Sequence, residues 1–483
     1  MGWLIFWIAL YLIVIIILSL RHLKTSDIDQ YMVNNRNTKT LPLVFTVLAT
    51  FVGGGTSIGL MALGYESGFA AVAIGVAYVI GFGILWKYAG KIRDFGAKKN
   101  IYSFPHFLNH TYTTPEEKNF AKIFSATVSG VNIFIFFFIL AAQFVAMASL
   151  LKFSFEIGYQ TAAIISAIII IAYTAIAGLS GVIITDTIQF IAIVIMIVLI
   201  FIPGILTDTE MFSRLGELPR EMLNGTQLGI VFLVGTPIFL SWSVLARMDI
   251  WQRVLAAKDE KTARKVSLWS GLGMLPFYII FPLVGMAVRL VIDYEISPDE
   301  TAGVAYIFID RHSSGFIMSF AVVGLLSALM SSGDSFLNII SISAVKDFVG
   351  WRKKKPASSA KAHQMIRIAT FIFGITALFI ALVFPNIVDL MVVGISTITI
   401  FAPITLFALI KKNAFAYRKA VIISILVAFF VNLFLFILGV YSPESFNPKS
   451  SFVPSIIIET IILLIGVKLT KIPKTEPEKA IEL

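Results

Sequence analysis

Residues 41–64 read LPLVFTVLATFVGGGTSIGLMALG, and this stretch decides the fold. The segment is apolar and longer than the roughly 20 residues that a helix needs to cross a bilayer. Its centre, however, holds the triplet Gly53-Gly54-Gly55, followed by Thr56 and Ser57. Backbone inside a membrane must be hydrogen-bonded internally, so an interrupted helix persists there only where protein, water or a ligand replaces the lost bonds. The triplet therefore predicts a membrane helix that is unwound at mid-depth, beside a binding site.

The composition extends the membrane assignment to the whole chain. Hydrophobic residues make up 58% of the 483 positions and charged residues only 14%, whereas soluble domains carry about 25% charged residues. The apolar run 2–20 is followed by basic residues and has no A-x-A-like site, so we expect a retained helix rather than a secretory signal. Cysteine is absent and no P-loop or catalytic serine motif occurs, which argues against thiol chemistry, an ATP-driven pump and an enzyme.

We expect an all-α membrane protein with about thirteen transmembrane helices. The predicted spans are 2–20, 41–64, 68–87, 122–151, 159–177, 182–203, 227–247, 267–291, 315–345, 366–385, 387–410, 417–440 and 452–470.

The basic residues are distributed unevenly between the loops. All but six of the 38 Lys and Arg fall in alternate loops and the C-terminal tail; the exceptions are Lys152, Arg214, Arg220, Arg289, Arg311 and Lys449. Basic loops stay in the cytoplasm. We therefore expect a multi-pass protein of the cell membrane with its N-terminus outside and its C-terminus in the cytoplasm. The net charge of +10 reflects this topology and does not indicate nucleic-acid binding.

Two later spans carry interruptions of the same kind. The seventh contains Gly235-Thr236-Pro237, and the eleventh contains Gly394 to Thr397 followed by Pro403. The Gly triplet and the Gly-Thr-Pro break each fall in the first helix of a block of five helices. Paired interruptions at corresponding places in two halves are typical of inverted-repeat transporters with a binding site at the membrane midplane.

A few polar residues lie inside the predicted helices. Intramembrane carboxylates are rare and mark functional sites by default, and here Asp186 and Asp334 are such residues. Ser331 and Ser332 lie one turn before Asp334. Hard cations prefer oxygen ligands, which unwound carbonyls of the second span and these hydroxyls could supply. Histidines are few and none lies mid-span, so the residue types favour Na⁺ over a transition metal.

Four motifs make the chain resemble the sodium/solute symporter family, which contains bacterial proline, sialic acid and galactose carriers and animal glucose and iodide carriers. In chain order they are Gly64-Tyr65-Glu66-Ser67-Gly68, the stretch from Gly178 to Gln189, the stretch from Trp251 through Gln252 and Arg253 to Lys258, and the stretch from Ala328 to Asp347.

The resemblance implies the fold of the leucine transporter, a core of 5+5 helices in two inverted repeats. One extra helix precedes this core and two follow it. The chain then divides into an N-terminal helix and loop (1–40), a first repeat (41–203), a second repeat (204–410) and two C-terminal helices with a short tail (411–483).

The resemblance also implies cation sites. The main Na⁺ site would consist of the carbonyls of Ala49, Val52 and Ala328 and the hydroxyls of Ser331 and Ser332. A second cation site would use Asp186, Asp334 and Ser335. Aspartate at 334 departs from the serine or alanine of some members, so the number of ions per cycle stays open.

The solute would bind at the midplane breaks. The candidate contact residues share that depth, and they are Phe51, Gly53, Thr56, Gln143, Phe239 and Trp242. A sugar is disfavoured, because no acidic residue stands near Gly75, where the galactose carrier has a glutamate. A small organic acid and an amino acid both remain open, because we find no arginine aimed at the cavity that would identify the solute.

These observations predict a sodium-coupled symporter that imports a small organic solute by alternating access. Its partners would be the solute, Na⁺ and the lipid bilayer; a monomer would suffice. A proton-coupled carrier on the same fold, with Asp334 or Asp186 titrating, is the main alternative. A membrane sensor or channel is the other.

Overall fold

The computed structural model describes residues 2–20, 28–175, 179–349 and 359–470, and these segments are almost entirely helical. Gly178 of the second motif and the tail after Thr470 lie outside the described residues. The helices are α1 (Gly2–Leu20), α2 (Ile28–Val33), α3 (Thr40–Phe51), α4 (Ile58–Ser67), α5 (Val72–Lys98), α6 (Phe104–Tyr112), α7 (Lys118–Phe155), α8 (Tyr159–Thr174), α9 (Leu179–Met196), α10 (Ile202–Asp208), α11 (Arg220–Leu223), α12 (Ile230–Phe239), α13 (Met248–Ala256), α14 (Glu260–Val291), α15 (Val304–His312), α16 (Gly315–Ile342), α17 (Ser359–Val383), α18 (Ile387–Thr399), α19 (Ala402–Ile410), α20 (Arg418–Tyr441) and α21 (Phe452–Leu469).

The described helices fit a membrane protein, although they do not settle the count of thirteen spans. Ten helical stretches are long and apolar enough to cross a bilayer, or up to eleven if the bent segment from Ile230 to Ala256 counts as one span. Two of the predicted spans contain shorter apolar helices, α3 and α8. The thirteen-span layout therefore remains a prediction.

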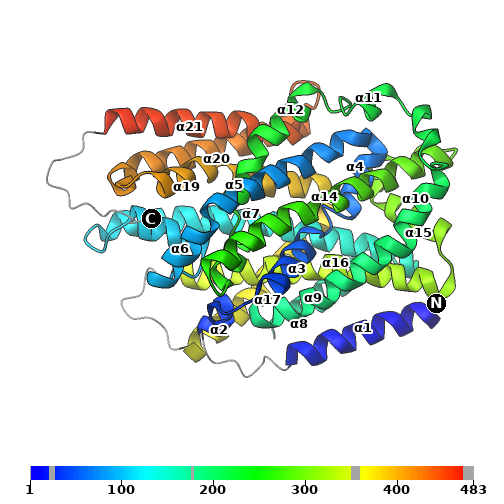
Figure 1. Ribbon diagram of the computed structural model, residues 1–483, viewed down its shortest axis with the longest axis horizontal. Helices are drawn as coiled ribbons and strands as arrows, with labels where there is room; N and C mark the ends of the chain where they lie inside the picture. The colour runs from blue at the N-terminus through cyan, green and yellow to red at the C-terminus, as the bar shows by residue number, and fades with distance from the viewer. Residues whose placement is uncertain (1, 21–27, 176–178, 350–358, 471–483) are drawn as a thin grey trace.

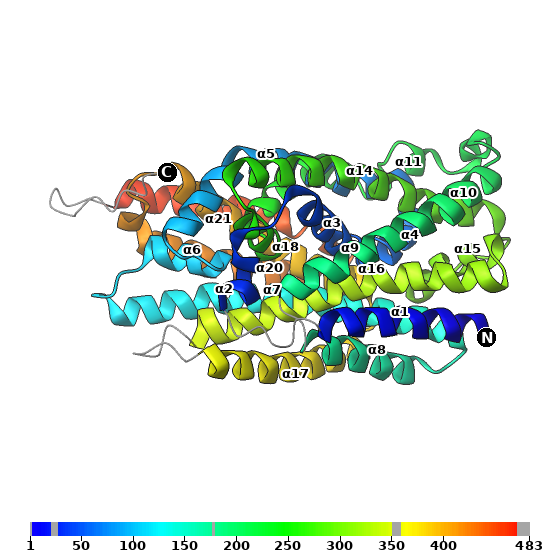
Figure 2. The same ribbon diagram turned by 60° about the horizontal axis from the view of Figure 1, so that its bottom comes forward.

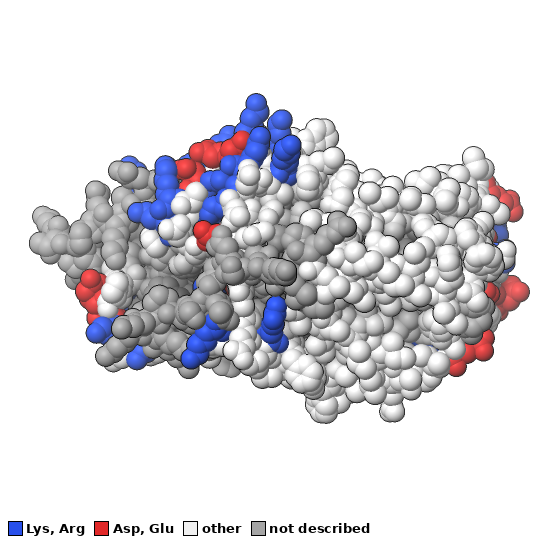
Figure 3. All heavy atoms as spheres, turned by 90° about the horizontal axis from the view of Figure 1, so that it is seen from below, with Lys and Arg blue, Asp and Glu red and all other residues white. Residues whose placement is uncertain are grey.

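The long helices run roughly along one axis, and the two ends of the bundle differ in charge. The start of α1 lies at one end, with α10, α11 and α15, and the last turn of α21 lies at the other, with α6 (Figures 1 and 2). Lys and Arg gather at the second end, whereas Asp and Glu mark the first, with a largely uncharged band between them (Figure 3). We call these the basic end and the acidic end. Such a distribution is expected of a protein that crosses a bilayer along this axis.

The second predicted span is broken where the glycines stand. Helix α3 ends at Phe51, residues 52–57 are non-helical, and α4 begins at Ile58. Thr56 N–H and Ser57 N–H both donate to the Gly53 carbonyl, so the interruption is a tight turn. The predicted unwinding is confirmed.

The breaks in the two later spans lie further along the chain than we predicted. Helix α12 continues through Gly235-Thr236-Pro237 to Phe239. The chain then tightens into 3₁₀ turns, η5 (Leu240–Ala246), and bends by 52° to enter α13. One proline removes only a single helical hydrogen bond, so the chain can stay helical past it at the cost of that bond. In the eleventh span α18 runs through Gly394 to Thr399, and the interruption comes at residues 400–401, just before Pro403.

Helix α16 is the central helix of the bundle. It packs against α3, α7, α8 and α9, and α1 lies along it from outside (Figure 2). All of its residues from Ala321 to Ile342 are buried. On the other side of the broken span, α14 packs against α4 and α5. The unwound segment is thus enclosed between α16 and α14, away from lipid.

Candidate functional site

A cavity of about 100 Å³ lies beside the unwound segment. Its volume is of the same order as cavities of about 150 Å³ that hold one ring-sized molecule. Four of the six predicted substrate-contact residues line it, namely Phe51, Gly53, Thr56 and Gln143. Tyr78, Tyr278, Arg247 and Ser396 add polar groups to walls that are otherwise apolar. A few polar groups in an apolar cavity are typical of small-molecule sites.

Side chains from other helices hold the unwound backbone in place. The Gly54 N–H donates to Gln143 Oε1 over 2.6 Å. The Thr56 and Tyr278 hydroxyls are hydrogen-bonded at 3.0 Å. A Cβ atom at Gly53 would lie 2.2 Å from the Ser332 hydroxyl oxygen, so only glycine allows this close approach. Gln143, which the sequence placed on the cavity wall, therefore also replaces one of the hydrogen bonds that the broken helix has lost.

Phe239 and Trp242 do not reach this cavity. They line a separate apolar groove between α12–η5, α19 and α21, which is walled by exposed side chains such as Ile457 and Leu464. These two aromatic residues lie on the side that faces α19 and α21. We do not retain them as substrate contacts.

The structure does place an arginine in the cavity, where the sequence indicated none. Arg247 stands at the bend between η5 and α13, and only 4% of it is exposed. Its Nε and Nη2 atoms donate to the Asp249 carboxylate, with an Nη2–Oδ2 distance of 2.6 Å. The guanidinium lies 4.1 Å from the centre of the Phe51 ring, in cation–π geometry. The signal in the sequence was an Arg two residues before an Asp, directly after an apolar span.

Of the predicted main Na⁺ ligands, Ser332 lies against the end of α3, whereas the hydroxyl of Ser331 donates to Asp186. The last helical bond of α3 runs from Val52 N–H to the Leu48 carbonyl, so the carbonyls from Ala49 onward lie beyond the helical ladder. Ser332 Oγ donates to the Thr50 carbonyl at 2.7 Å and to the Ala328 carbonyl at 3.2 Å. The C-terminal end of a helix also carries partial negative charge. Carbonyl and hydroxyl oxygens at such an end suit a hard cation.

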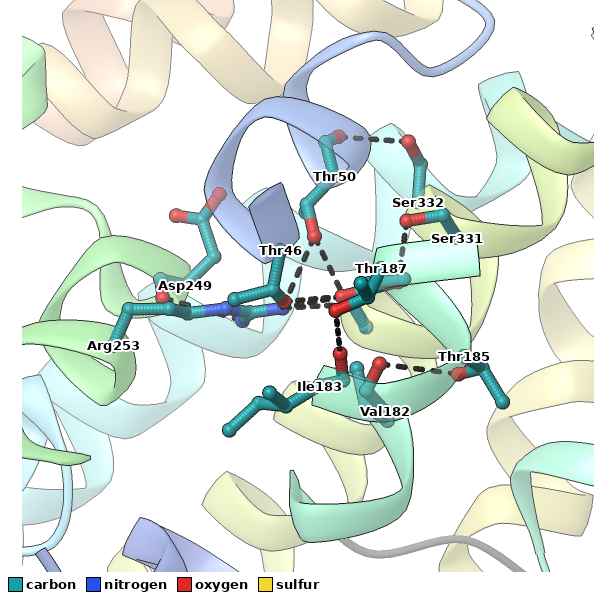
Figure 4. A network of polar contacts seen from close by, with 12 residues as sticks. Thr46, Thr50, Val182, Ile183, Thr185, Thr187, Asp249, Arg253, Ser331 and Ser332 are labelled. Atoms are coloured by element: carbon teal, nitrogen blue, oxygen red, sulfur yellow. Dashed lines mark hydrogen bonds and ion pairs between the residues drawn. The ribbon is translucent and has the colours of Figure 1, made fainter. Parts of the chain in front are cut away.

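The predicted second cation site is divided by the side chain of Arg253. Asp186 accepts hydrogen bonds from the hydroxyls of Thr46 and Ser331, the latter at 2.5 Å. Arg253 Nη2 lies 3.5 Å from Asp186 and donates to Ser335 Oγ at 2.9 Å. Figure 4 shows the guanidinium reaching from α13 between Thr46 and Thr50 towards α16. Asp186 and Ser335 are therefore joined through an arginine.

Asp334 stands outside this Arg253 network. It is fully buried, and the Tyr173 hydroxyl and the Ser335 backbone lie near its carboxylate, although neither makes a hydrogen bond of good geometry within the described residues. Its neighbours include Tyr173 and Tyr11. The sequence grouped Asp334 with Asp186 and Ser335, but a helix turns by about 100° per residue, so adjacent residues 334 and 335 face different neighbours.

The two ends of the cavity differ. Towards the acidic end its walls include Lys449, which lies 3.8 Å from Glu66, and Phe452. Towards the basic end, Trp251 is 1% exposed and packs against Phe104 and Phe107, with ring centroids 5.4 and 4.7 Å apart. Helix α6 thus packs two aromatic rings against α13 on this side of the bundle, outside the residues that line the cavity.

Comparisons with known proteins bear on the family and the fold of the chain. A family model described as the sodium:solute symporter family matches residues 31–417. The sodium/proline symporter of Staphylococcus aureus (strain bovine RF122 / ET3-1) is 25% identical, over 96% of this chain and 92% of the relative.

Two solved structures share the fold. The substrate-bound outward-open state of a Na⁺-coupled sialic acid symporter superposes with a TM-score of 0.76 at 18% identity, covering 95% of this chain and 96% of that one. A nucleobase-cation-symport-1 family transporter in a closed conformation, with bromovinylhydantoin bound, gives a TM-score of 0.57 at 13% identity, over 91% of this chain and 94% of that one. Both support the leucine-transporter-like fold. The family model matches most of the chain, and the broken span with its polar lining lies inside the shared fold. The chain therefore belongs to the sodium:solute symporter family and couples the import of a small solute to Na⁺.

Proposed function

We propose that the coupling Na⁺ binds where α3 ends against α16, and that the solute binds in the adjoining cavity. The ion would be held by the carbonyls of Ala49, Val52 and Ala328 and by the hydroxyls of Ser331 and Ser332. The observation that carries this proposal is the contact from Ser332 Oγ to the Thr50 carbonyl, 2.7 Å long. It brings a hydroxyl of α16 against the freed carbonyls of the broken span.

We further propose that the solute is small and bears a carboxylate. Arg247 supports this, because its Nη1 atom takes no part in the bonds to Asp249 and arginine pairs well with carboxylates. The apolar remainder of the wall, including Phe51 and Ile395, suits an aliphatic body. The relatives at 25% identity are named sodium/proline symporters, so proline is the first compound to test.

The orientation follows from the charge distribution. Because basic loops stay in the cytoplasm, the basic end would face inward, the N-terminus outward and the C-terminal tail inward. The cavity is lined by Lys449 towards its acidic end. The cycle would move the repeats 41–203 and 204–410 relative to each other, with 1–40 and 411–483 at the periphery.

Coupling arises because the ion binds two elements that separate on opening inward. Na⁺ held between α3 and α16 favours the state in which they touch, by the difference in its affinity for the two states. Ion entry is also driven by the membrane potential, which contributes about 2.3 kcal/mol per elementary charge for each 100 mV. Inward release should follow the separation of α3 from α16.

The experiment is solute uptake into proteoliposomes with and without an inward Na⁺ gradient. Proline, other small amino acids, short monocarboxylates and sugars are compared as competitors. We expect inhibition by carboxylates, none by the matching amides, and a large rise in half-saturating solute for Arg247→Gln. Arg311→Gln is the control, because Arg311 is half-exposed at the acidic end and pairs with Asp208. Competition by sugars alone, or full activity of Arg247→Gln, would refute the assignment of the solute class.

A further inference from the structure

Asn432 of α20 reaches the wall of the solute cavity from outside the proposed repeats. It is 2% exposed, and α20 packs against α18. Its Nδ2 atom donates to Ser396 Oγ at 3.1 Å and to Thr397 Oγ1 at 3.0 Å. Ser396 lines the cavity. A single hydroxyl group would therefore separate the amide of a peripheral helix from the bound solute.

Helix α21 fixes the orientation of this amide. The hydroxyl of Ser455, which is fully buried on α21, donates to Asn432 Oδ1 at 3.4 Å. An asparagine side chain carries two N–H donors at one end and a carbonyl acceptor at the other. Because Ser455 donates to the acceptor end, the donor end faces Ser396 and Thr397. Asn432 thus presents N–H groups, and not its carbonyl oxygen, to α18.

The contacts around Ser396 give its hydroxyl group a direction. A hydroxyl has one proton to donate and two lone pairs that accept. Asn432 occupies a lone pair, so the proton of Ser396 remains for another acceptor. Within the chain this acceptor is the Val393 carbonyl at 3.2 Å, which already accepts from Thr397 Oγ1 at 2.7 Å. The proton can therefore turn into the cavity without leaving that carbonyl unpaired.

We propose that Asn432 is a positioning residue for solute recognition, which holds the Ser396 hydroxyl as a hydrogen-bond donor to the solute carboxylate. An ionised carboxylate only accepts hydrogen bonds, so a hydroxyl whose lone pair is already taken matches it. Arg247 lines the same cavity and would supply the positive charge. The inference rests on the proposed function, because it takes a carboxylate solute in this cavity.

The test is a double-mutant cycle on solute uptake by the full-length protein in proteoliposomes. Labelled proline is the probe, replaced by the best-competing labelled monocarboxylate if proline is not carried. Ser396→Ala removes the donor, and Asn432→Leu removes the amide that orients it while keeping a side chain of similar shape. Each change should raise the half-saturating solute concentration about tenfold, the effect expected for losing a hydrogen bond to a charged group. The double variant should be no worse than Ser396→Ala, because groups of one hydrogen-bond network are not additive.

Ser424→Ala is the matched control. Ser424 is also buried on α20, but its hydroxyl donates to the Val421 carbonyl at 2.9 Å and to Glu459 of α21 at 3.2 Å. Its replacement should leave the half-saturating solute concentration unchanged. A second readout is the half-saturating Na⁺ concentration at saturating solute. This value should stay unchanged in Asn432→Leu, because only a general loosening of the fold would move both.

The possible outcomes are distinct. Wild-type solute affinity in well-folded Asn432→Leu would overturn the inference, and so would additive effects in the double variant. If Asn432→Leu does not fold, Asn432→Ala, which introduces no bulk, takes its place in the cycle. Normal affinity in Ser396→Ala while Arg247→Gln is impaired would sink this inference alone. Full activity of Arg247→Gln, or competition by sugars alone, would sink the proposed solute class.

Discussion

Replacing Gly53 by alanine should separate the broken span from α16. The added Cβ would lie 2.2 Å from Ser332 Oγ and 2.6 Å from both Ser332 Cβ and Gln143 Oε1. Carbon atoms do not approach oxygen atoms this closely, so α16 or the unwound segment must move by roughly 1 Å, a shift typical of overpacked sites. That movement would pull the Ser332 hydroxyl away from the freed carbonyls of α3.

The size of the effect follows from the cost of overpacking. Extra methyl groups in well-packed sites cost about 1–3 kcal/mol, and each 1.4 kcal/mol is a factor of about ten in affinity. We therefore expect the half-saturating Na⁺ concentration for uptake to rise roughly 5- to 150-fold in Gly53→Ala.

The assay is the initial rate of uptake in proteoliposomes over a series of Na⁺ concentrations. Gly130→Ala is the control, because a Cβ atom at this α7 glycine would have no heavy atom within 4 Å. It should behave like the wild type. Unaltered Na⁺ dependence in a well-folded Gly53→Ala protein would refute the close approach on which the site depends.

Two further predictions concern neighbouring groups. Gln143→Leu leaves the Gly54 N–H without its acceptor, which costs about 1–3 kcal/mol for a buried group. The affinity for the solute should therefore fall. It should fall less in Gln143→Glu, because this variant keeps an acceptor. The second concerns His106 of α6, where burial lowers the pKa to about 4 from the ordinary 6.5. The imidazole stays neutral in the folded protein, whereas in the unfolded chain it is protonated below pH 6.5. The contribution of the buried neutral ring to stability is therefore present above pH 6.5 and is lost as the pH falls towards 4. The unfolding temperature should therefore drop between pH 7 and pH 5 by more in the wild type than in His106→Asn, and an equal drop would contradict the burial of the ring.

The sequence predicted the unwinding of the second span correctly because a glycine triplet has a strong local effect. Three successive residues without Cβ atoms weaken a helix wherever they stand, and a membrane tolerates the break only at a supported site. Gln143 was found for a related reason, since an amide inside a membrane helix needs a partner. The last helical hydrogen bond of α3, at Val52, and the hydrogen bond from Ser332 to the Thr50 carbonyl are consistent with a break that is supported by its neighbours.

Prediction failed where tertiary packing decides the outcome. The Gly-Thr-Pro sequence predicted a helix break at residues 235–237. Instead, α12 continues to Phe239 and the bend lies at Arg247. Trp242 lines the groove beside α21 and not the cavity at the broken span. The pairing of Arg247 with Asp249 could be suspected from their spacing, but its place in the cavity depends on the bend. Likewise, only the helix rotation shows that Asp334 and Ser335 face different neighbours.

The most direct test of the central claim is the Na⁺ dependence of solute uptake by Ser332→Ala, measured beside Ser319→Ala. Ser319 also lies on α16, but its hydroxyl donates only within its own helix, to the Gly315 carbonyl. Losing a hydroxyl that contacts a charged ligand costs about 1.5–3 kcal/mol. We predict at least about a tenfold rise in half-saturating Na⁺ for Ser332→Ala and no change for Ser319→Ala. Identical Na⁺ curves for the wild type and Ser332→Ala would contradict the placement of the ion between α3 and α16.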